Sequence, residues 1–115
     1  MSFRWPNKDP DEQLDYSVDW SRFLGTATIS TVTWSVKSTA YSTKTTLGAG
    51  QTLTVASSSA TTDDIQNVSQ TNNNTVATIN IGGGTNNIEY TFFCNMVDST
   101  GSQAERSIKL RVKER

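Results

Sequence analysis

Apolar side chains recur at every second position in several short stretches of the chain, and this alternation restricts the possible folds more than any other feature. A period of two puts one side chain into a core and the next into solvent, as in a half-buried β-strand. An amphipathic helix needs a period of about 3.6 residues, and the sequence shows no such pattern. The alternation therefore predicts an all-β protein.

The alternating stretches indicate six or seven short strands. The side chains expected to face the core are, in chain order, Leu14, Tyr16, Val18 and Trp20; Val32, Trp34 and Val36; Leu53 and Val55; Ala77, Ile79 and Ile81; Tyr90, Phe92, Cys94 and Met96; and Ile108, Leu110 and Val112. Ile29 is out of phase with the residues that follow it, which predicts a β-bulge near Ser30–Thr31. Because Phe93 and Val97 lie on the opposite side of the fifth stretch, we expect that strand to be central and covered on both faces. The sequence Asp98-Ser99-Thr100-Gly101 predicts a tight hairpin turn.

The composition agrees with one small β-domain. The chain has 115 residues, enough for a single domain, and 32 of them are serine or threonine. Leucine and alanine are too scarce for a helical bundle. We predict a single immunoglobulin-like antiparallel β-sandwich at residues 14–115, preceded by an extended N-terminal arm at residues 1–13. The lone cysteine, Cys94, excludes an internal disulfide, and its apolar neighbours indicate a buried side chain rather than a reactive thiol.

The same composition excludes most chemistry. Without histidine there is no Ser-His-Asp or Cys-His relay and no histidine-ligated metal. The net charge of −1 argues against a general nucleic-acid binder, and no apolar run reaches the roughly 18 residues of a membrane span. Asp9, Asp11 and Glu12 do not have the spacing of a calcium-binding loop. We therefore expect no enzyme, no catalytic residue, no cofactor and no metal, and neither nucleic acid nor membrane as a partner.

Two segments are expected to be irregular. Ser57–Asn74 contains only Ile65 and Val68 as sizeable apolar side chains, which predicts a long exposed loop or a weak edge strand near residues 65–68. The alternative is a partner-binding loop that becomes ordered on assembly. Gly82-Gly83-Gly84 lacks the lysine and the helix that follow a phosphate-binding loop, so we interpret it as a mobile hairpin tip.

Charge is unevenly distributed along the chain. Acidic residues crowd the first fifth of the sequence, and half of the basic residues lie in its last ten positions. Either these charges pair across the first and last strands, which are often neighbours in such sandwiches, or they mediate head-to-tail contacts between copies of the chain.

The N-terminal arm is the main candidate for a binding site. An aromatic segment ahead of the first strand either folds back on its own domain or docks on a neighbour. We favour a neighbour, and the residues assigned to partner binding are Phe3, Arg4, Trp5, Lys8 and Lys113. The alternative for the exposed aromatic residue is sugar stacking, as in a carbohydrate-binding module.

Two segments of the chain carry a family resemblance. The first contains Trp5-Pro6-Asn7-Lys8-Asp9-Pro10-Asp11-Glu12, followed by Leu14-Asp15-Tyr16, Asp19-Trp20 and Leu24-Gly25. The second is the closing strand, Arg106-Ser107-Ile108-Lys109-Leu110-Arg111-Val112-Lys113. Both resemble a family of small tailed-bacteriophage and prophage proteins described as immunoglobulin-like adaptors between tail fibre and tail. Residues from about Lys37 to Asn87 do not follow the family pattern.

The resemblance implies a non-enzymatic structural protein of the phage virion. It would link the tail fibre to the tail or neck through protein–protein contacts, in multiple copies within a symmetric assembly. Its partners would be tail, neck or fibre subunits, and the absence of a signal peptide and of disulfides suits assembly in the host cytoplasm. A capsid decoration protein bound to the major capsid protein, and a carbohydrate-binding module, are the alternatives.

Overall fold

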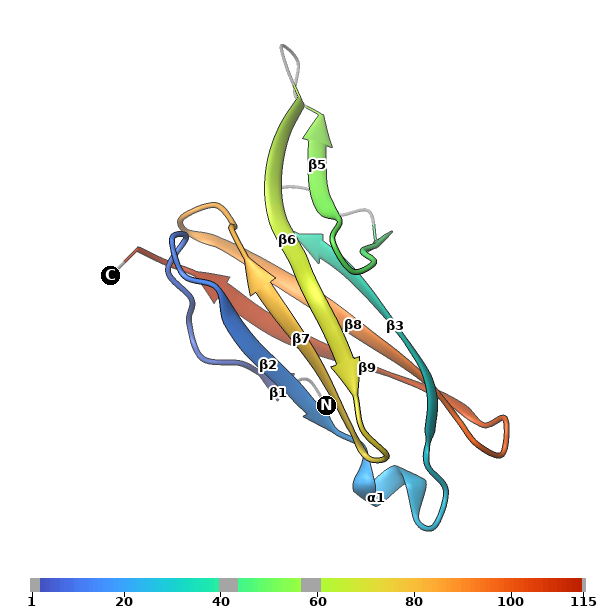
Figure 1. Ribbon diagram of the computed structural model, residues 1–115. Helices are drawn as coiled ribbons and strands as arrows, with labels where there is room; N and C mark the ends of the chain where they lie inside the picture. Colours follow the sequence, from blue (N-terminus) through green and yellow to red (C-terminus); the bar gives the residue numbers. More distant parts are fainter. Residues whose placement is uncertain (1–2, 40–43, 57–60, 115) are drawn as a thin grey trace.

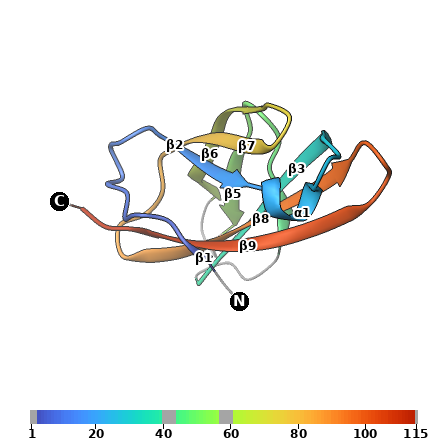
Figure 2. The same cartoon turned by 90° about the horizontal axis from the view of Figure 1, so that it is seen from below.

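The computed structural model describes residues 3–39, 44–56 and 61–114, which form two β-sheets packed face to face (Figures 1 and 2). In sheet A the strand order is β1 (Phe3–Arg4), β9 (Gln103–Val112), β8 (Ile88–Asp98), β3 (Ile29–Ser38) and β4 (Thr45–Thr46). In sheet B it is β2 (Leu14–Asp19), β7 (Val76–Gly82), β6 (Thr61–Asn72) and β5 (Thr52–Ala56). One turn of helix, α1 (Ser21–Leu24), links β2 to β3. The predicted all-β sandwich is confirmed, and its arrangement is compatible with an immunoglobulin-like domain.

The strands follow the alternation of the sequence. β2, β7, β8 and β9 bury side chains at every second position, and β8 is the central strand of sheet A, as expected. The register of β3 on β8 shifts between Ile29 and Thr31, which confirms the predicted β-bulge. The turn between β8 and β9 is closed by Gly101 at φ 90°, a conformation that favours glycine, and this confirms the predicted hairpin.

One hydrophobic core fills the space between the sheets. Its aromatic centre is made of Trp20, Trp34, Tyr90 and Phe92, each at most 1% exposed. Cys94 is buried among them, as predicted, and this burial raises the pKa of its thiol to about 11. Among the described residues, no helix is long and apolar enough to span a membrane.

The segment expected to be a loop contains the longest described strand of the sandwich. β6 pairs with β5 on one side and β7 on the other, so it is neither a loop nor an edge strand; residues 57–60 of the expected loop lie outside the described residues. The buried Asn67 donates through Nδ2 to the carbonyl of Leu47 and to the side chain of Gln70, each at 2.9 Å. Backbone pairing on both edges and the two hydrogen bonds from Nδ2 of Asn67 stabilise this strand. A count of apolar residues along the sequence detects neither contribution.

The β5–β6 hairpin extends beyond the other strands (Figure 1). β7 pairs with β6 only from Gln66 to Asn72, whereas residues 61–63 of β6 pair with β5. The hairpin contributes to the elongated shape of the molecule, which measures 49 × 27 × 26 Å.

The triple-glycine connection between β7 and β8, expected to be a mobile tip, is held by contacts with both ends of the chain. The ammonium group of Lys8 donates to the carbonyl of Gly83 at 2.5 Å. Gly84 lies so close to β9 that a Cβ at this position would be 2.8 Å from Cγ2 of Val112. Glycine at position 84 therefore allows the connection between β7 and β8 to pass close to β9.

Candidate interaction surfaces

The N-terminal segment lies against its own sandwich. β1 pairs in parallel with β9, which places Phe3 opposite Ile108 and Arg4 opposite Lys109. The amide of Trp5 continues this pairing by donating to the carbonyl of Lys109 at 2.9 Å. The described part of the predicted arm thus folds back on its own domain. Its role in partner binding, and the division of the chain after residue 13, stay predictions.

Trp5 packs at the open edge between the two sheets. Its ring stacks on Tyr16 with 4.8 Å between ring centres, and it contacts Trp34 at 6.0 Å and Phe92 at 5.7 Å. Its Nε1 donates to the carbonyl oxygen of Ser17 in β2 at 3.2 Å. Trp5 therefore connects sheet A to the edge strand of sheet B, and much of its aromatic surface is already occupied by the core.

Arg106 makes a second connection across the same edge. Its Nη1 donates to the carbonyl of Asp19 at 3.2 Å, and its guanidinium lies 4.6 Å from the ring centre of Trp20. Hydrogen bonds from Ser21, and to a lesser degree the charge of Arg106, hold the pKa of the Asp19 carboxyl below its usual range. Trp5 and Arg106 thus each donate a side-chain hydrogen bond to a backbone carbonyl of β2. Because these carbonyls already have partners, this edge is a poor template for strand addition.

A pocket of about 280 Å³ opens beside these two connections. It lies between β1, β9 and β2 and is lined by Arg4, Trp5, Ser17, Val18, Asp19, Arg106 and Ile108. Its lining combines apolar side chains with two guanidinium groups and one carboxylate. This combination suits an inserted side chain of a protein partner, because aromatic and arginine residues around a pocket dominate binding energy at protein interfaces.

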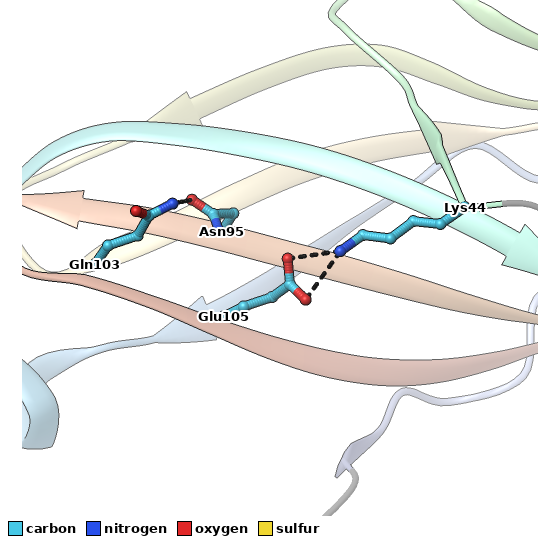
Figure 3. Close-up of polar contacts among 4 residues, drawn as sticks. All are labelled: Lys44, Asn95, Gln103 and Glu105. Carbon is cyan, nitrogen blue, oxygen red and sulfur yellow. Dashed lines mark hydrogen bonds and ion pairs between the residues drawn. The ribbon is translucent and has the colours of Figure 1, made fainter.

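The outer face of sheet A carries an ordered layer of charged and amide groups. Lys44 reaches across it to Glu105, with a closest distance of 2.8 Å, and Gln103 donates to Asn95 at 3.0 Å (Figure 3). Phe93 lies beneath Lys44, whose ammonium is 4.5 Å from its ring centre. Lysine side chains, rather than a further layer of structure, thus cover Phe93 on the outer face of the central strand.

A second ion-pair cluster lies on the same face. Arg4 Nη2 is 2.8 Å from Glu89 Oε2, and Lys109 Nζ is 3.5 Å from Glu89 Oε1. The hydrogen bond from Arg4, together with both positive charges, lowers the pKa of the Glu89 carboxyl. Sequence reasoning did not select Glu89, Lys44 or Glu105. The signal available for Glu89 and Glu105 was their outward position in the alternation of β8 and β9, and for Lys44 it was the position beside β4.

Lys8 is a structural residue in this fold. Its side chain is fully buried, and its ammonium donates to the carbonyls of Asp9 and Gly83 at 2.9 and 2.5 Å. Desolvation lowers the pKa of Lys8, partly opposed by Glu12 and other nearby carboxylates. The side chain is not accessible to a partner, so its placement does not support the predicted binding role.

The remaining predicted residues do not join the pocket. Lys113 is exposed beyond the end of β9, where its amide donates to the carbonyl of Lys8 at 2.8 Å. Phe3 is placed by its backbone in β1. The pocket thus brings together only Arg4 and Trp5 of the five predicted residues. Within the described part of the chain, no group of three or more acidic or cysteine side chains could hold a metal ion.

One comparison with known proteins identifies the family. The model of a family described as podophage GP4 fiber-tail adaptor protein gp77 matches residues 8–111, which include all of β2 through β8 and nearly all of β9. No curated protein matches the sequence. The family match confirms the resemblance seen in the sequence and makes the protein a structural, non-enzymatic component of the phage virion with a tail-adaptor role. The chain therefore belongs to the podophage gp77 family of fibre–tail adaptor proteins.

Proposed function

We propose that this protein joins a fibre subunit to the tail or neck by receiving a side chain of one partner in the pocket between β1 and β2. The observation that carries the proposal is the pocket itself, whose lining joins the apolar Trp5 and Ile108 to the charged Arg4, Asp19 and Arg106. Such a site gives both burial and orientation to an inserted residue.

The lining is suited to an acidic or amide-bearing partner segment. Arg4 is 52% exposed although it pairs with Glu89, so its guanidinium is partly hydrated and free to rearrange. Arg106 is held over Trp20, which fixes the direction of its charge. Guanidinium groups bind carboxylates in planar geometry, and this geometry would fix the register of the two proteins.

The proposal places the protein in the virion after assembly in the host cytoplasm. Nothing in the geometry favours a capsid position, and the packing of Trp5 into the core removes the aromatic platform that carbohydrate binding would require. The adaptor role is therefore the function that this geometry supports best.

The test is to remove a charged group from the pocket lining and measure binding. Arg4 lines the pocket and its side chain is 52% exposed, so Arg4→Ala should weaken the contact, whereas Arg22→Ala removes the same charge at an exposed position in α1. Biolayer interferometry with the purified fibre and tail proteins of the same phage should show about a tenfold or greater loss of affinity for one partner with the first variant. The control variant should bind normally. Unchanged binding of Arg4→Ala to both partners would refute the pocket as the contact.

A further inference from the structure

Basic side chains gather on the outer face of sheet A. The register sets Lys109 of β9 opposite Thr91 of β8, and Thr91 opposite Lys37 of β3. Neighbouring strands are about 4.8 Å apart, so this row spans about 10 Å across the sheet. Alternate residues of β9 are buried, which turns both Lys109 and Arg111 outward. Three cations of the central strands thus point to the same side.

Lys44 adds a fourth cation from the segment beside β4. Its ammonium lies 4.5 Å from the ring centre of Phe93, and that of Lys37 lies 5.7 Å from the same ring. Figure 3 shows Lys44 reaching over the sheet to Glu105. Because Phe93 belongs to the central strand β8, its ring holds two ammonium groups over the middle of sheet A. We call the surface made by Lys37, Lys44, Lys109 and Arg111 the basic face.

The carboxylates of this side do not balance its cations. The outward carboxylates in the described strands of sheet A are Glu89 and Glu105, against four cations of the basic face. Glu89 also pairs with Arg4 at the edge of the pocket. Within the described part of the chain, neither Lys37 nor Arg111 forms an ion pair with a carboxylate. The basic face therefore keeps an excess of positive charge, although the whole chain has a net charge of −1.

We propose that the basic face binds an acidic surface of a second protein, the partner that does not use the pocket between β1 and β2. This inference rests on the proposed adaptor function, because an adaptor needs a separate contact for each protein that it joins. The two surfaces have different positions. The pocket opens at the edge between the sheets, whereas the basic face lies on the flat side of sheet A that points away from sheet B (Figure 2).

The chemistry of the basic face favours an acidic protein over a nucleic acid. Glu89 and Glu105 are held among the cations by ion pairs of 2.8 Å, and fixed carboxylates repel a continuous row of phosphates. Beside them, Gln103 donates to Asn95 at 3.0 Å (Figure 3), so amide groups on the same side can exchange hydrogen bonds with polar groups of a protein. Complementary charges of this kind accelerate association and exclude wrong partners.

The test neutralises the two cations that form no ion pair. Lys37→Gln with Arg111→Gln leaves every residue of the pocket unchanged and lowers the net charge by two units. Arg22→Glu is the matched control, because it lowers the net charge equally at an exposed position in α1. Biolayer interferometry uses the purified fibre and tail proteins of the same phage as probes. At about 0.1 M salt, the double variant should lose about fivefold or more of its affinity for one of them.

The loss should disappear at about 1 M salt, where the Debye length falls from about 10 Å to about 3 Å. The control should bind both probes normally, and normal binding of the double variant to the other probe shows that it is folded. A loss that persists at 1 M salt would overturn the proposal. Binding of a DNA duplex by the wild type, measured by fluorescence polarisation and lost in the double variant, would also overturn it.

Comparison with Arg4→Ala separates this inference from the pocket. If the double variant weakens one partner while Arg4→Ala weakens neither, the pocket fails and the basic face stands. If the double variant binds both partners normally, the basic face is excluded as a contact, whatever Arg4→Ala does. Loss of the same partner with both variants would overturn the assignment of the basic face to a second protein.

Discussion

Replacing Trp5 by alanine should destabilise the isolated protein. Full removal of a buried tryptophan costs about 3–5 kcal/mol, and Trp5 is only partly buried, so its packing on Tyr16, Trp34 and Phe92 should contribute about 2 kcal/mol. The hydrogen bond from Nε1 to Ser17 adds about 1 kcal/mol. We expect a total loss of about 3 kcal/mol, which corresponds to a fall in melting temperature of at least about 10 °C.

Urea unfolding followed by far-ultraviolet circular dichroism would measure this loss. Trp5→Phe provides the matched control, because it retains most of the ring contacts and removes only the N–H donor, so it should lose about 1 kcal/mol. A residue that served only as a docking arm would behave differently, since exposed positions change stability by less than about 0.5 kcal/mol. If Trp5→Ala stays within that limit, the placement of Trp5 between the sheets is wrong.

Three further predictions concern groups that hold the ends of the strands. Lys8→Met should lower the free energy of unfolding in urea by about 2 kcal/mol, because the partly buried hydrogen bonds to the carbonyls of Asp9 and Gly83 are lost. Hydrogen bonds led by the Thr100 hydroxyl lower the folded-state pKa of Asp98, so its contribution is present above the unfolded-state value of about 4 and is lost as the pH falls through the folded-state value. Asp98→Asn should therefore be less stable than the wild type at neutral pH, and thermal melts should show the gap narrowing below about pH 4. Gly84→Ala should cost about 2 kcal/mol or more by the same urea assay, because φ is 100° there and the new methyl would meet Val112 at 2.8 Å.

Much of the fold could be predicted because strand periodicity is a local property. The inward positions of β2, β7, β8 and β9, the bulge after Ile29 and the turn at Gly101 all follow from residue type and spacing over a few positions. The prediction for β6 was wrong because its stability comes from pairing on both edges and from the buried amide of Asn67.

The candidate sites depended more on tertiary structure than the strands did. Arg4 and Trp5 were selected from the sequence, but Arg106 and Asp19 join them only because β9 and β2 meet at one edge of the sandwich. Lys8 was selected as a basic surface residue, and the fold buries it because its ammonium reaches the carbonyl of Gly83, 75 positions further along the chain. Neither outcome has a local signature, since each joins groups far apart along the chain.

The sequence by itself determined that the chain is a small β-protein without the residues for common catalysis, and its motifs pointed to phage adaptors. Only the tertiary structure decided which strands share a sheet, and hence that Asp19 of β2 and Arg106 of β9 line one pocket. The physical reason is that side-chain alternation is imposed by backbone geometry within each strand, whereas the grouping of charges depends on pairing between strands that the chain visits out of order.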